Sequence, residues 1–536
     1  MRKIEKTDYA YDAIDKINKN FDDIEAGIGG GSSDLIEKGT YVGRGQYFAR
    51  KDFDGVRVGD FLRLEFTEGN WDDVEGVSDS YAKLAVGYLD SKENTHALFL
   101  VNMGQTIQPG YDIYVSPALV DVFSSLYVYI RAQTDDVIPF VLRRISADRI
   151  KDYYREEMMD TINKVRARIS TDCVTFAVVT DVHYRSYQNG SVIAPYVFLE
   201  SCINIAELHR HVRLDNVVCM GDIIDGRTSA IQSIRDADDS MGALSGMETP
   251  FFFSLGNHDV NRYYSENAGE TGDRILTPTE IYSLYFQPLD ERRVAGAENG
   301  MNYYRDIDRM KVRLVVLKSV TDAGQYAYSS ATADWFESLI ADTPNDWKVV
   351  VFTHVPLLPS HGYNGASAFN AKINTALQSD KVITLFEGHV HGDNVFATPN
   401  WAVQVGCNKS VNFDPTSSAW PEGEMLFTRT GGTATEDLWD ACVVDPTNAL
   451  LSCIRFGAGI DRYIHYTPVE VAAGGTTTLT PSCITADSWE TRESETAISI
   501  ASGTVTIAAG TTAGTRLMAI AKDEEGNMEI WCIKVS

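Results

Sequence analysis

The chain has 536 residues, of which 44% are hydrophobic and 23% charged, a composition typical of a folded protein with enough apolar material for a large core. Its formal net charge of −28 argues against nucleic acid as anything other than a substrate, because contacts to a phosphate backbone need clustered Lys and Arg. No apolar run is long enough to span a bilayer, and residues 1–6 lack the features of a secretory signal.

Residues 1–31 are expected to form an oligomerising helix that ends in a flexible glycine linker. Apolar residues recur there at alternating spacings of four and three, the pattern of helices that pair along one stripe. These positions are Ala10, Ile14, Ile17, Phe21, Ile24 and Ile28. Because so short a helix is marginal alone, we expect a homo-oligomer, with a trimer favoured. The alternative is a single amphipathic helix that lies on its own domain.

Residues 35–145 are expected to form an all-β module, a sandwich, because short apolar or alternating runs are separated by Gly, Asp and Asn. Three aromatic residues of this module, Trp71, Tyr127 and Tyr129, either stack on sugars or belong to its core. Residues 146–170 are predicted to form a connecting helix with one apolar face. That face consists of Ile150, Tyr154, Met158, Ile162, Val165 and Ile169.

Residues 173–466 alternate between strand-like and helix-like runs, which is typical of an α/β domain. Residues 467–536 are rich in Thr, Ala, Gly and Ser and show no helical face. They are expected to form a small β-sandwich of immunoglobulin-like type that binds or stacks but carries no chemistry. The eight cysteines show no CxxC spacing, and several lie in apolar runs, so buried free thiols are expected.

Five apolar runs of the α/β segment end in polar residues of the kinds that bind metals. The runs at 174–180, 217–220, 251–255, 349–352 and 382–386 precede Asp-Val-His, Gly-Asp-Ile-Ile-Asp, Gly-Asn-His-Asp, Thr-His-Val-Pro and Glu-Gly-His-Val-His-Gly-Asp, respectively. In α/β sheets, ligands bind in the crevice beyond the carboxyl ends of the strands. We therefore expect these five segments to converge on one cleft.

Seven side chains in these segments are candidate metal ligands. They are Asp181, His183, Asp222, Asn257, His354, His389 and His391. A single ion would be oversupplied with ligands, whereas two ions that share a carboxylate would use them all. The donors are imidazole, carboxylate and one amide, without thiolate, a set that suits Zn, Fe, Mn or Ni. Gly388 and Gly392 give the last turn the freedom to gather both of its imidazoles.

The series DVH, GDIID, GNHD, a lone His and GHVH resembles that of the calcineurin-like metallophosphoesterases over about residues 173–466. The resemblance implies an α/β/β/α sandwich with a dinuclear metal centre inside a multidomain chain. On the family's pattern Asp181, His183 and His391 would bind the first metal, Asn257, His354 and His389 the second, and Asp222 would bridge them.

The resemblance also implies the activity, that of a metal-dependent phosphoric ester hydrolase. Two cations would clamp the phosphoryl oxygens and lower the pKa of a shared water, so that a bridging hydroxide attacks in line. His258 resembles the histidine that protonates the leaving oxygen, and Asp225 resembles the carboxylate that orients its ring. The alternative for His258 is a turn histidine that only packs.

Departures from better-known branches leave the substrate open. The protein Ser/Thr phosphatases carry an arginine directly after the second Asp of GDxxD, where this chain has Gly226 and only then Arg227. Purple acid phosphatases carry a tyrosine where Asp225 stands. Candidate substrate contacts are Arg227, Tyr263, His361 and Tyr363.

The order of the segments, with the INKNFDDI seam in the first helix, resembles a bacteriophage tail or receptor-binding protein. That resemblance implies a virion or extracellular location and a phosphodiester polymer of the host surface, such as teichoic acid, as substrate. One alternative is a cytoplasmic bacterial phosphodiesterase or phosphatase that acts on soluble nucleotides or other small molecules. Another is a structural or adhesive tail protein with an inactive metal site. The sequence leaves the metal identity and the choice between phosphodiester and phosphomonoester open.

Overall fold

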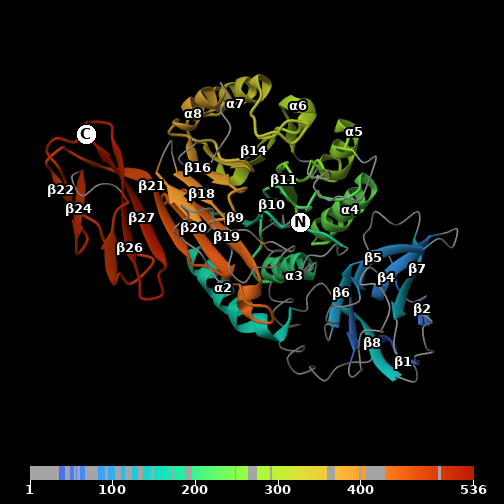
Figure 1. Cartoon of the computed structure of the whole chain (residues 1–536). Coiled ribbons are helices and arrows are strands. Elements are labelled where there is room, and N and C mark those ends of the chain that lie inside the picture. Colours follow the sequence, from blue (N-terminus) through green and yellow to red (C-terminus); the bar gives the residue numbers. More distant parts are fainter. Residues whose placement is uncertain are drawn as a thin grey trace, which may run out of the picture.

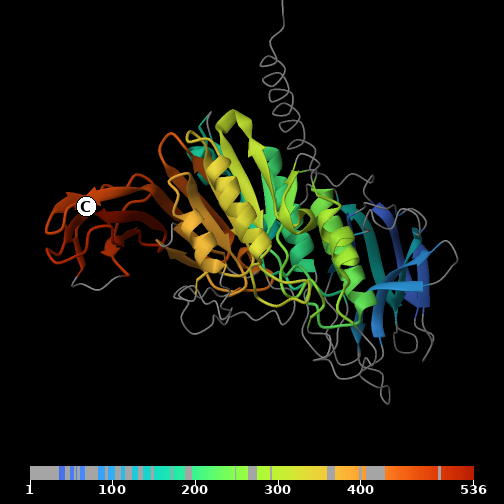
Figure 2. The same ribbon diagram turned by 90° about the horizontal axis from the view of Figure 1, so that it is seen from above.

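The computed structural model describes residues 35–42, 49–53, 56, 61–66, 82–90, 95–102, 110–114, 123–130, 137–145, 150–170, 173–186, 196–247, 249–262, 274–289, 293–358, 369–397, 401–405, 408, 429–492 and 497–536. The oligomerising helix expected in residues 1–31 lies outside these residues, so it stays a prediction. Figures 1 and 2 show an all-β part, a central α/β part and a C-terminal β part following one another along the molecule.

The N-terminal described part consists of two four-stranded antiparallel sheets, with strand orders β1-β8-β3-β6 and β2-β7-β4-β5. Leu62, Leu64, Leu84 and Val86 are fully buried, as alternating apolar strands require. Tyr127 is also buried and therefore belongs to the core, whereas Trp71 lies outside the described residues. The strands are β1 (Leu35–Val42), β2 (Ala49–Phe53), β3 (Phe61–Phe66), β4 (Ala82–Asp90), β5 (Thr95–Asn102), β6 (Gly110–Tyr114), β7 (Phe123–Ile130) and β8 (Val137–Ile145).

The connecting segment is helical, with the 3-10 helix η2 (Asp152–Tyr154) leading into α2 (Arg155–Arg168). Met158, Ile162 and Val165 of the expected apolar face are buried. Ile169 is 39% exposed, because it follows the last helical residue and the chain turns away from the face there.

The centre of the fold is built on a nine-stranded sheet, in the order β11-β10-β9-β19-β20-β21-β27-β26-β23, and a seven-stranded sheet, in the order β12-β13-β14-β15-β16-β18-β17. The central strands of the first sheet are β9 (Val174–Val179), β10 (Asn216–Cys219), β11 (Phe251–Phe253), β19 (Leu438–Asp445), β20 (Leu450–Gly457) and β21 (Arg462–Val471). Those of the second are β12 (Val294–Ala295), β13 (Tyr303–Ile307), β14 (Val312–Leu317), β15 (Lys348–Thr353), β16 (Val382–Glu387), β17 (Asn394–Phe396) and β18 (Trp401–Gln404).

Helices cover the outer faces of the two sheets, as Figure 1 shows. The helices α7 (Ser330–Asp342) and α8 (Asn370–Leu377) share an apolar cluster with β14, β15 and β16. The helices α2, α3 (Tyr196–His211) and α4 (Ala230–Gly246) contribute buried side chains to the cluster that contains the strands of the nine-stranded sheet. The shorter helices are α5 (Pro278–Ile281), the π-helix η4 (Tyr282–Phe286), α6 (Ala297–Gly300), and the 3-10 helices η5 (Asp308–Met310) and η7 (Ala434–Glu436).

Three phenylalanines join the two sheets in the middle of the core. Phe176 of β9 meets Phe352 of β15 and Phe386 of β16 edge-on, with ring centroids 5.4 Å and 5.8 Å away. The rings of Phe352 and Phe386 stack on each other at 5.3 Å. All three side chains are completely buried. Because each strand ends at a candidate metal ligand, this contact also fixes the distance between the two sets of strand ends.

The C-terminal strands continue the nine-stranded sheet. β21 pairs in parallel with β27 (Met528–Val535), which pairs with β26 (Arg516–Lys522), and β23 (Ser488–Glu490) forms the edge. A separate three-stranded sheet contains β22 (Thr476–Thr478), β25 (Thr504–Ile507) and β24 (Ile498–Ala501). The boundary expected between residues 466 and 467 falls inside β21, because this ten-residue strand belongs to both parts. Residues 467–536 thus extend the central sheet, and the strands of this extension and of the three-stranded sheet enclose an apolar cluster of their own.

Seven of the cysteines lie among the described residues, where all are free and six are buried. Within the same described part, no helix is both long and apolar enough to cross a membrane.

Replacing Phe176 by alanine should destabilise the central domain by about 3–5 kcal/mol, because a large side chain would leave a cavity between two sheets. The matched control is Ile231→Ala on α4, where the side chain is 67% exposed, and it should change the unfolding free energy by less than about 0.5 kcal/mol. Chemical denaturation followed by tryptophan fluorescence checks both. Equal midpoints for the two variants would contradict the packing described above.

Candidate metal centre

The seven candidate ligands lie on turns at the carboxyl ends of five strands. β9, β10 and β11 run parallel in one sheet, and β15 and β16 run parallel in the other, so the turns that follow them meet at one edge. Asp181 and His183 follow β9, Asp222 follows β10, Asn257 follows β11, His354 follows β15, and His389 and His391 follow β16. The structure therefore brings all seven predicted residues together.

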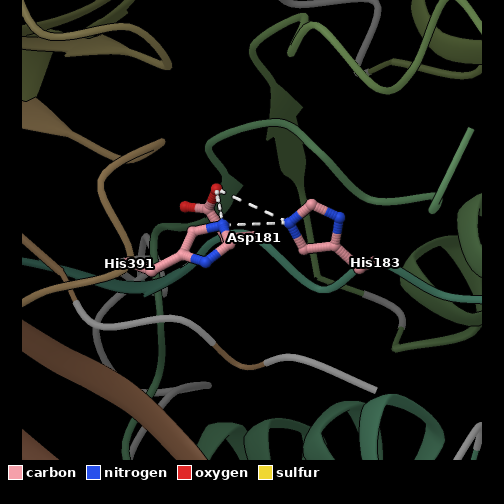
Figure 3. Close-up of side chains that lie close together, drawn as sticks. All are labelled: Asp181, His183 and His391. Atoms are coloured by element: carbon pink, nitrogen blue, oxygen red, sulfur yellow. Dashed lines mark hydrogen bonds and ion pairs between the residues drawn. The ribbon is translucent and has the colours of Figure 1, made fainter. Parts of the chain in front are cut away.

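The first group of donors consists of Asp181, His183 and His391, whose side chains point toward one another in Figure 3. The Nε2 atoms of His183 and His391 lie 3.1 Å apart. Oδ1 of Asp181 lies 3.3 Å from Nε2 of His391 and 4.0 Å from Nε2 of His183. Three donors from two distant segments thus surround a space of the size of one cation.

The second group consists of Asp222, His354 and His389, with Asn257 beside them. Oδ2 of Asp222 lies 3.2 Å from Nε2 of His354, and the same His354 nitrogen lies 3.2 Å from Oδ1 of Asn257. The rings of His354 and His389 have centroids 5.2 Å apart.

Asp222 also reaches the first group, because its Oδ2 lies 3.9 Å from Nε2 of His183. The donor atoms of each group lie within 4.8 Å of one another. The residues therefore fit two cations that share one carboxylate, with the oxygen and nitrogen donors that Mn, Fe, Zn or Ni accept. The assignment of each residue as a ligand stays a prediction from sequence that this geometry supports.

Five of these residues have positive φ angles, a backbone conformation that residues other than glycine rarely adopt. The φ angles are 51° for Asp181, 46° for His183, 50° for Asp222, 69° for His389 and 60° for His391. Each such residue costs about 1–3 kcal/mol and persists only when its surroundings hold it in place. Such strain is concentrated at functional sites, so its position here supports a functional role for these turns.

Hydrogen bonds between neighbouring turns stabilise these strained backbone conformations. The main-chain N–H of His183 donates to the carbonyl oxygen of Asp222 at 2.8 Å, and the N–H of His389 donates to Oδ2 of Asp181 at 2.9 Å. The carboxylate of Asp259, fully buried, accepts from the N–H groups of Asp222, Ile223 and Gly256. Sequence reasoning gave Asp259 no role, although it is the last residue of the Gly-Asn-His-Asp motif.

Burial and the charges within the site together lower the pKa values of Asp222 and His389 and raise that of His354. Burial acts to raise the pKa of the Asp222 carboxyl, but the imidazoles of His354 and His258 outweigh it and hold that pKa well below its usual range. Burial acts to lower the pKa of His354, but the carboxylate of Asp222 raises it to about 9. Burial and then the charge of His354 lower the pKa of His389 to about 3. Without a cation, a proton on His354 thus balances Asp222, and a bound cation would replace that proton.

His258 lies beside both groups of metal donors, but the hydrogen-bond partner of its ring differs from the one predicted. Its Nε2 lies 3.9 Å from Oδ2 of Asp222, and its ring meets that of His183 edge-on at 4.5 Å. Its Nδ1 contacts the main-chain oxygen of Asp225 at 2.5 Å. The carboxylate of Asp225 instead accepts a hydrogen bond from Arg185, which is buried. The sequence predicted that the carboxylate of Asp225 orients the ring of His258. In the structure the main-chain carbonyl of Asp225 makes this contact, because the carboxylate is bound by the guanidinium of Arg185.

Two half-buried arginines lie near the donor groups. Nε of Arg227 lies 4.0 Å from Oδ1 of Asp225, on the side of His258. On the side of His389, the ring of Tyr326 packs against that histidine at 4.6 Å, and the guanidinium of Arg262 lies over the same tyrosine at 5.2 Å. Arg262 and Tyr326 were not predicted from the sequence. The remaining predicted contacts, Tyr263, His361 and Tyr363, lie outside the described residues.

Comparisons with known proteins bear on this centre. The family described as Calcineurin-like phosphoesterase matches residues 174–393. An Arabidopsis thaliana protein described as Manganese-dependent ADP-ribose/CDP-alcohol diphosphatase is 22% identical over 255 residues, covering 41% of this chain and 81% of that protein. A purple acid phosphatase, PPD1 from yellow lupin (Lupinus luteus), aligns with a TM-score of 0.35 and 11% identity over 79% of this chain and 72% of that chain. A phosphopantetheinyl hydrolase of Mycobacterium tuberculosis aligns with a TM-score of 0.23 and 10% identity over 44% and 91%, respectively.

Replacing Gly256 by alanine should weaken metal binding at least tenfold. A Cβ atom at this position would lie 2.2 Å from both the main-chain nitrogen and Oδ1 of Asp222, so the shared carboxylate would have to move. The matched control is Gly510→Ala, where the space around the Cβ is open. Titration of the metal-free proteins with Mn²⁺ by calorimetry compares them. Wild-type affinity in Gly256→Ala would show that the position of Asp222 does not govern binding.

Proposed function

We propose, on the premise that residues 174–393 of this chain form a calcineurin-like phosphoesterase domain and make it a metal-dependent phosphoric ester hydrolase, that its substrate is a soluble small molecule cleaved at the P–O–P linkage of a diphosphate. The observation that carries the proposal is the pair of donor groups sharing Asp222. Two cations bound there would clamp the phosphoryl oxygens, offset the charge that develops on them and lower the pKa of a shared water.

The metal proposed for both positions is Mn²⁺. Its support is the description of the Arabidopsis thaliana relative as manganese-dependent, together with a donor set free of thiolate. In the proposed reaction Asp181, His183 and His391 would hold one cation, Asn257, His354 and His389 would hold the other, and Asp222 would contribute to both. The strained turns keep these donors in place before substrate arrives, so that little reorganisation accompanies the reaction.

His258 is proposed as the proton donor to the leaving oxygen. Its Nε2 faces the space between the two groups, 3.9 Å from Oδ2 of the shared Asp222. The contact of its Nδ1 with the carbonyl oxygen of Asp225 requires a proton on Nδ1, since a carbonyl oxygen can only accept. Nε2 is then the nitrogen that gives or takes the catalytic proton.

The class of ester is proposed from the relative and from the arginines near the donor groups. The relative is described as a diphosphatase of ADP-ribose and CDP-alcohols, substrates in which a second phosphate adjoins the reacting one. In this chain the guanidinium of Arg262, which also donates to the carbonyl oxygen of Gly324 at 2.6 Å, offers that second phosphate a positive charge beside His389. Arg227 offers another on the side of His258.

A second, separate prediction is that the protein belongs to a phage tail and hydrolyses teichoic acid. It rests on the segment of residues 1–31 and on the order of the domains, and the first of these lies outside the described residues. Release of phosphate-linked products from purified teichoic acid, in parallel with ADP-ribose, would decide between a polymer and a soluble substrate.

Replacing His258 by alanine should lower kcat about 10²- to 10⁴-fold, the range for loss of a general acid, while the stoichiometry of bound Mn²⁺ stays at the wild-type value. Hydrolysis of ADP-ribose and of bis-p-nitrophenyl phosphate with added Mn²⁺ measures the first, and elemental analysis measures the second. The proposal fails if the variant retains the wild-type kcat, or if the wild-type protein hydrolyses only p-nitrophenyl phosphate.

Replacing Arg262 by alanine should raise KM for ADP-ribose about tenfold or more, since a charge-assisted contact to the second phosphate would be lost. For the monoester p-nitrophenyl phosphate, which has no second phosphate, KM should change by less than about twofold, since the only contact removed is the one to a second phosphate. The control is Arg213→Ala, an exposed arginine just before β10, at the opposite end of the strand from the site. An equal rise in KM for both substrates would remove the proposed role of Arg262.

A further inference from the structure

The last residue of the stretch that contains both imidazoles, Asp393, is held by arginines from distant strands. Asp393 comes two residues after His391 and directly before β17, and it is 1% exposed. Its two carboxylate oxygens accept from Nη1 and Nη2 of Arg455 at 2.8 Å and 2.9 Å. Oδ1 also accepts from Nη1 of Arg462 at 3.3 Å.

The two arginines share a second carboxylate in the same buried network. Nε of Arg455 donates to Oδ1 of Asp440 at 2.8 Å, and Nη2 of Arg462 donates to Oδ2 of the same residue. Asp440, Arg455 and Arg462 come from β19, β20 and β21, and all three are buried. Two arginines and two aspartates therefore form a closed, charge-balanced network that joins three strands of the nine-stranded sheet to the turn after β16.

A third arginine holds the same segment from further along the chain. Nη1 of Arg492 donates to the carbonyl oxygen of Val395 in β17 at 2.8 Å. The chain between Gly388 and Val395 is thus attached at its far end by side chains from residues 455, 462 and 492. All of these residues lie beyond the 174–393 region that matches the family.

The attachment matters because the turn it follows is strained. His389 and His391 both have positive φ angles, and the near end of the turn is held through the N–H of His389 and Oδ2 of Asp181. A strained turn fixed at one end only would relax and carry its imidazoles away from Asp181 and His354. Fixing the far end through Asp393 keeps both imidazoles at the site.

We propose that Asp393 is a positioning residue of the metal centre, and that β20 and β21 complete this centre through Arg455 and Arg462. This inference rests on the proposed metal centre, because it concerns the two imidazoles that would bind cations. It predicts that loss of the Asp393 carboxylate lowers metal affinity beyond any effect on stability. A purely structural network would lower stability alone.

The test compares Asp393→Asn with Asp440→Asn. Each substitution removes one of the two carboxylates from the same network and leaves the same excess of positive charge, but only Asp393 adjoins the turn of His389 and His391. Thermal unfolding of the metal-free proteins measures stability, and calorimetric titration with Mn²⁺ measures affinity and stoichiometry. We expect similar losses of stability, with Mn²⁺ affinity at least tenfold lower in Asp393→Asn and within threefold of wild type in Asp440→Asn.

Equal Mn²⁺ affinities in the two variants would overturn the positioning role, even if both are less stable than wild type. If the wild-type protein binds no Mn²⁺, it is the proposed function that fails, so the two failures can be told apart. If Asp393→Asn does not fold, Arg492→Ala decides, because it removes the bond to Val395 and leaves the Asp393 carboxylate in place. Its control is Arg168→Ala, where Nη2 donates to the carbonyl oxygen of Cys483 at 3.0 Å, remote from the turn. We expect about threefold weaker Mn²⁺ binding in Arg492→Ala alone, and identical affinities would refute the inference.

Discussion

One carboxylate oxygen, Oδ2 of Asp222, lies between three imidazoles that come from three different turns. It is 3.2 Å from Nε2 of His354 and 3.9 Å from Nε2 of both His183 and His258. No local element could make these contacts, because the three histidines are separated by up to 171 positions along the chain, from residue 183 to residue 354. The contacts exist because β9, β10, β11 and β15 all end at the same edge of two packed sheets. Both donor groups, and with them the proposed chemistry, depend on this arrangement.

The turns at that edge contain residues in unfavourable backbone conformations. Asp181, His183 and Asp222 adopt positive φ angles. The carboxylate of Asp259 accepts hydrogen bonds from the N–H groups of the neighbouring turns, and the phenylalanines between the sheets fix the spacing of the strand ends. The folded core therefore stabilises a geometry that the isolated segments would not keep. Cations would bind at such a site with little rearrangement, which is what electrostatic stabilisation of a phosphoryl group requires.

The sheet that supports the centre extends far beyond the segment that resembles the family. β21 begins at Arg462, which contacts Asp393, and pairs with β27 from Arg462 to Val471 with a register shift after His465. The C-terminal strands and the turn of the two imidazoles therefore contact the same strand. The C-terminal part is thus connected to the chemistry through hydrogen bonds and ion pairs, rather than appended to it. This explains why a long stretch without any catalytic motif is nevertheless joined so closely to the central domain.

Sequence pattern alone predicted which residues lie together and which kinds of ion they would bind. Hydrophobic runs that end in Asp, Asn and His predict strand ends, and parallel strands bring their ends together, so the seven donors and the α/β fold follow from local pattern and a general rule. The buried face of the connecting helix and the buried cysteines follow from local pattern in the same way.

Only the tertiary structure decided which partner each polar group has. Asp225 was expected to orient His258 through its carboxylate, but the buried Arg185 takes that carboxylate and leaves the carbonyl for the ring. Asp393 lies inside a motif that was recognised, yet its partners Arg455 and Arg462 come from strands in which no motif points to residue 393. The physical reason is that ion pairs have no sequence period. Their partners are chosen by the packing of sheets that no local pattern specifies.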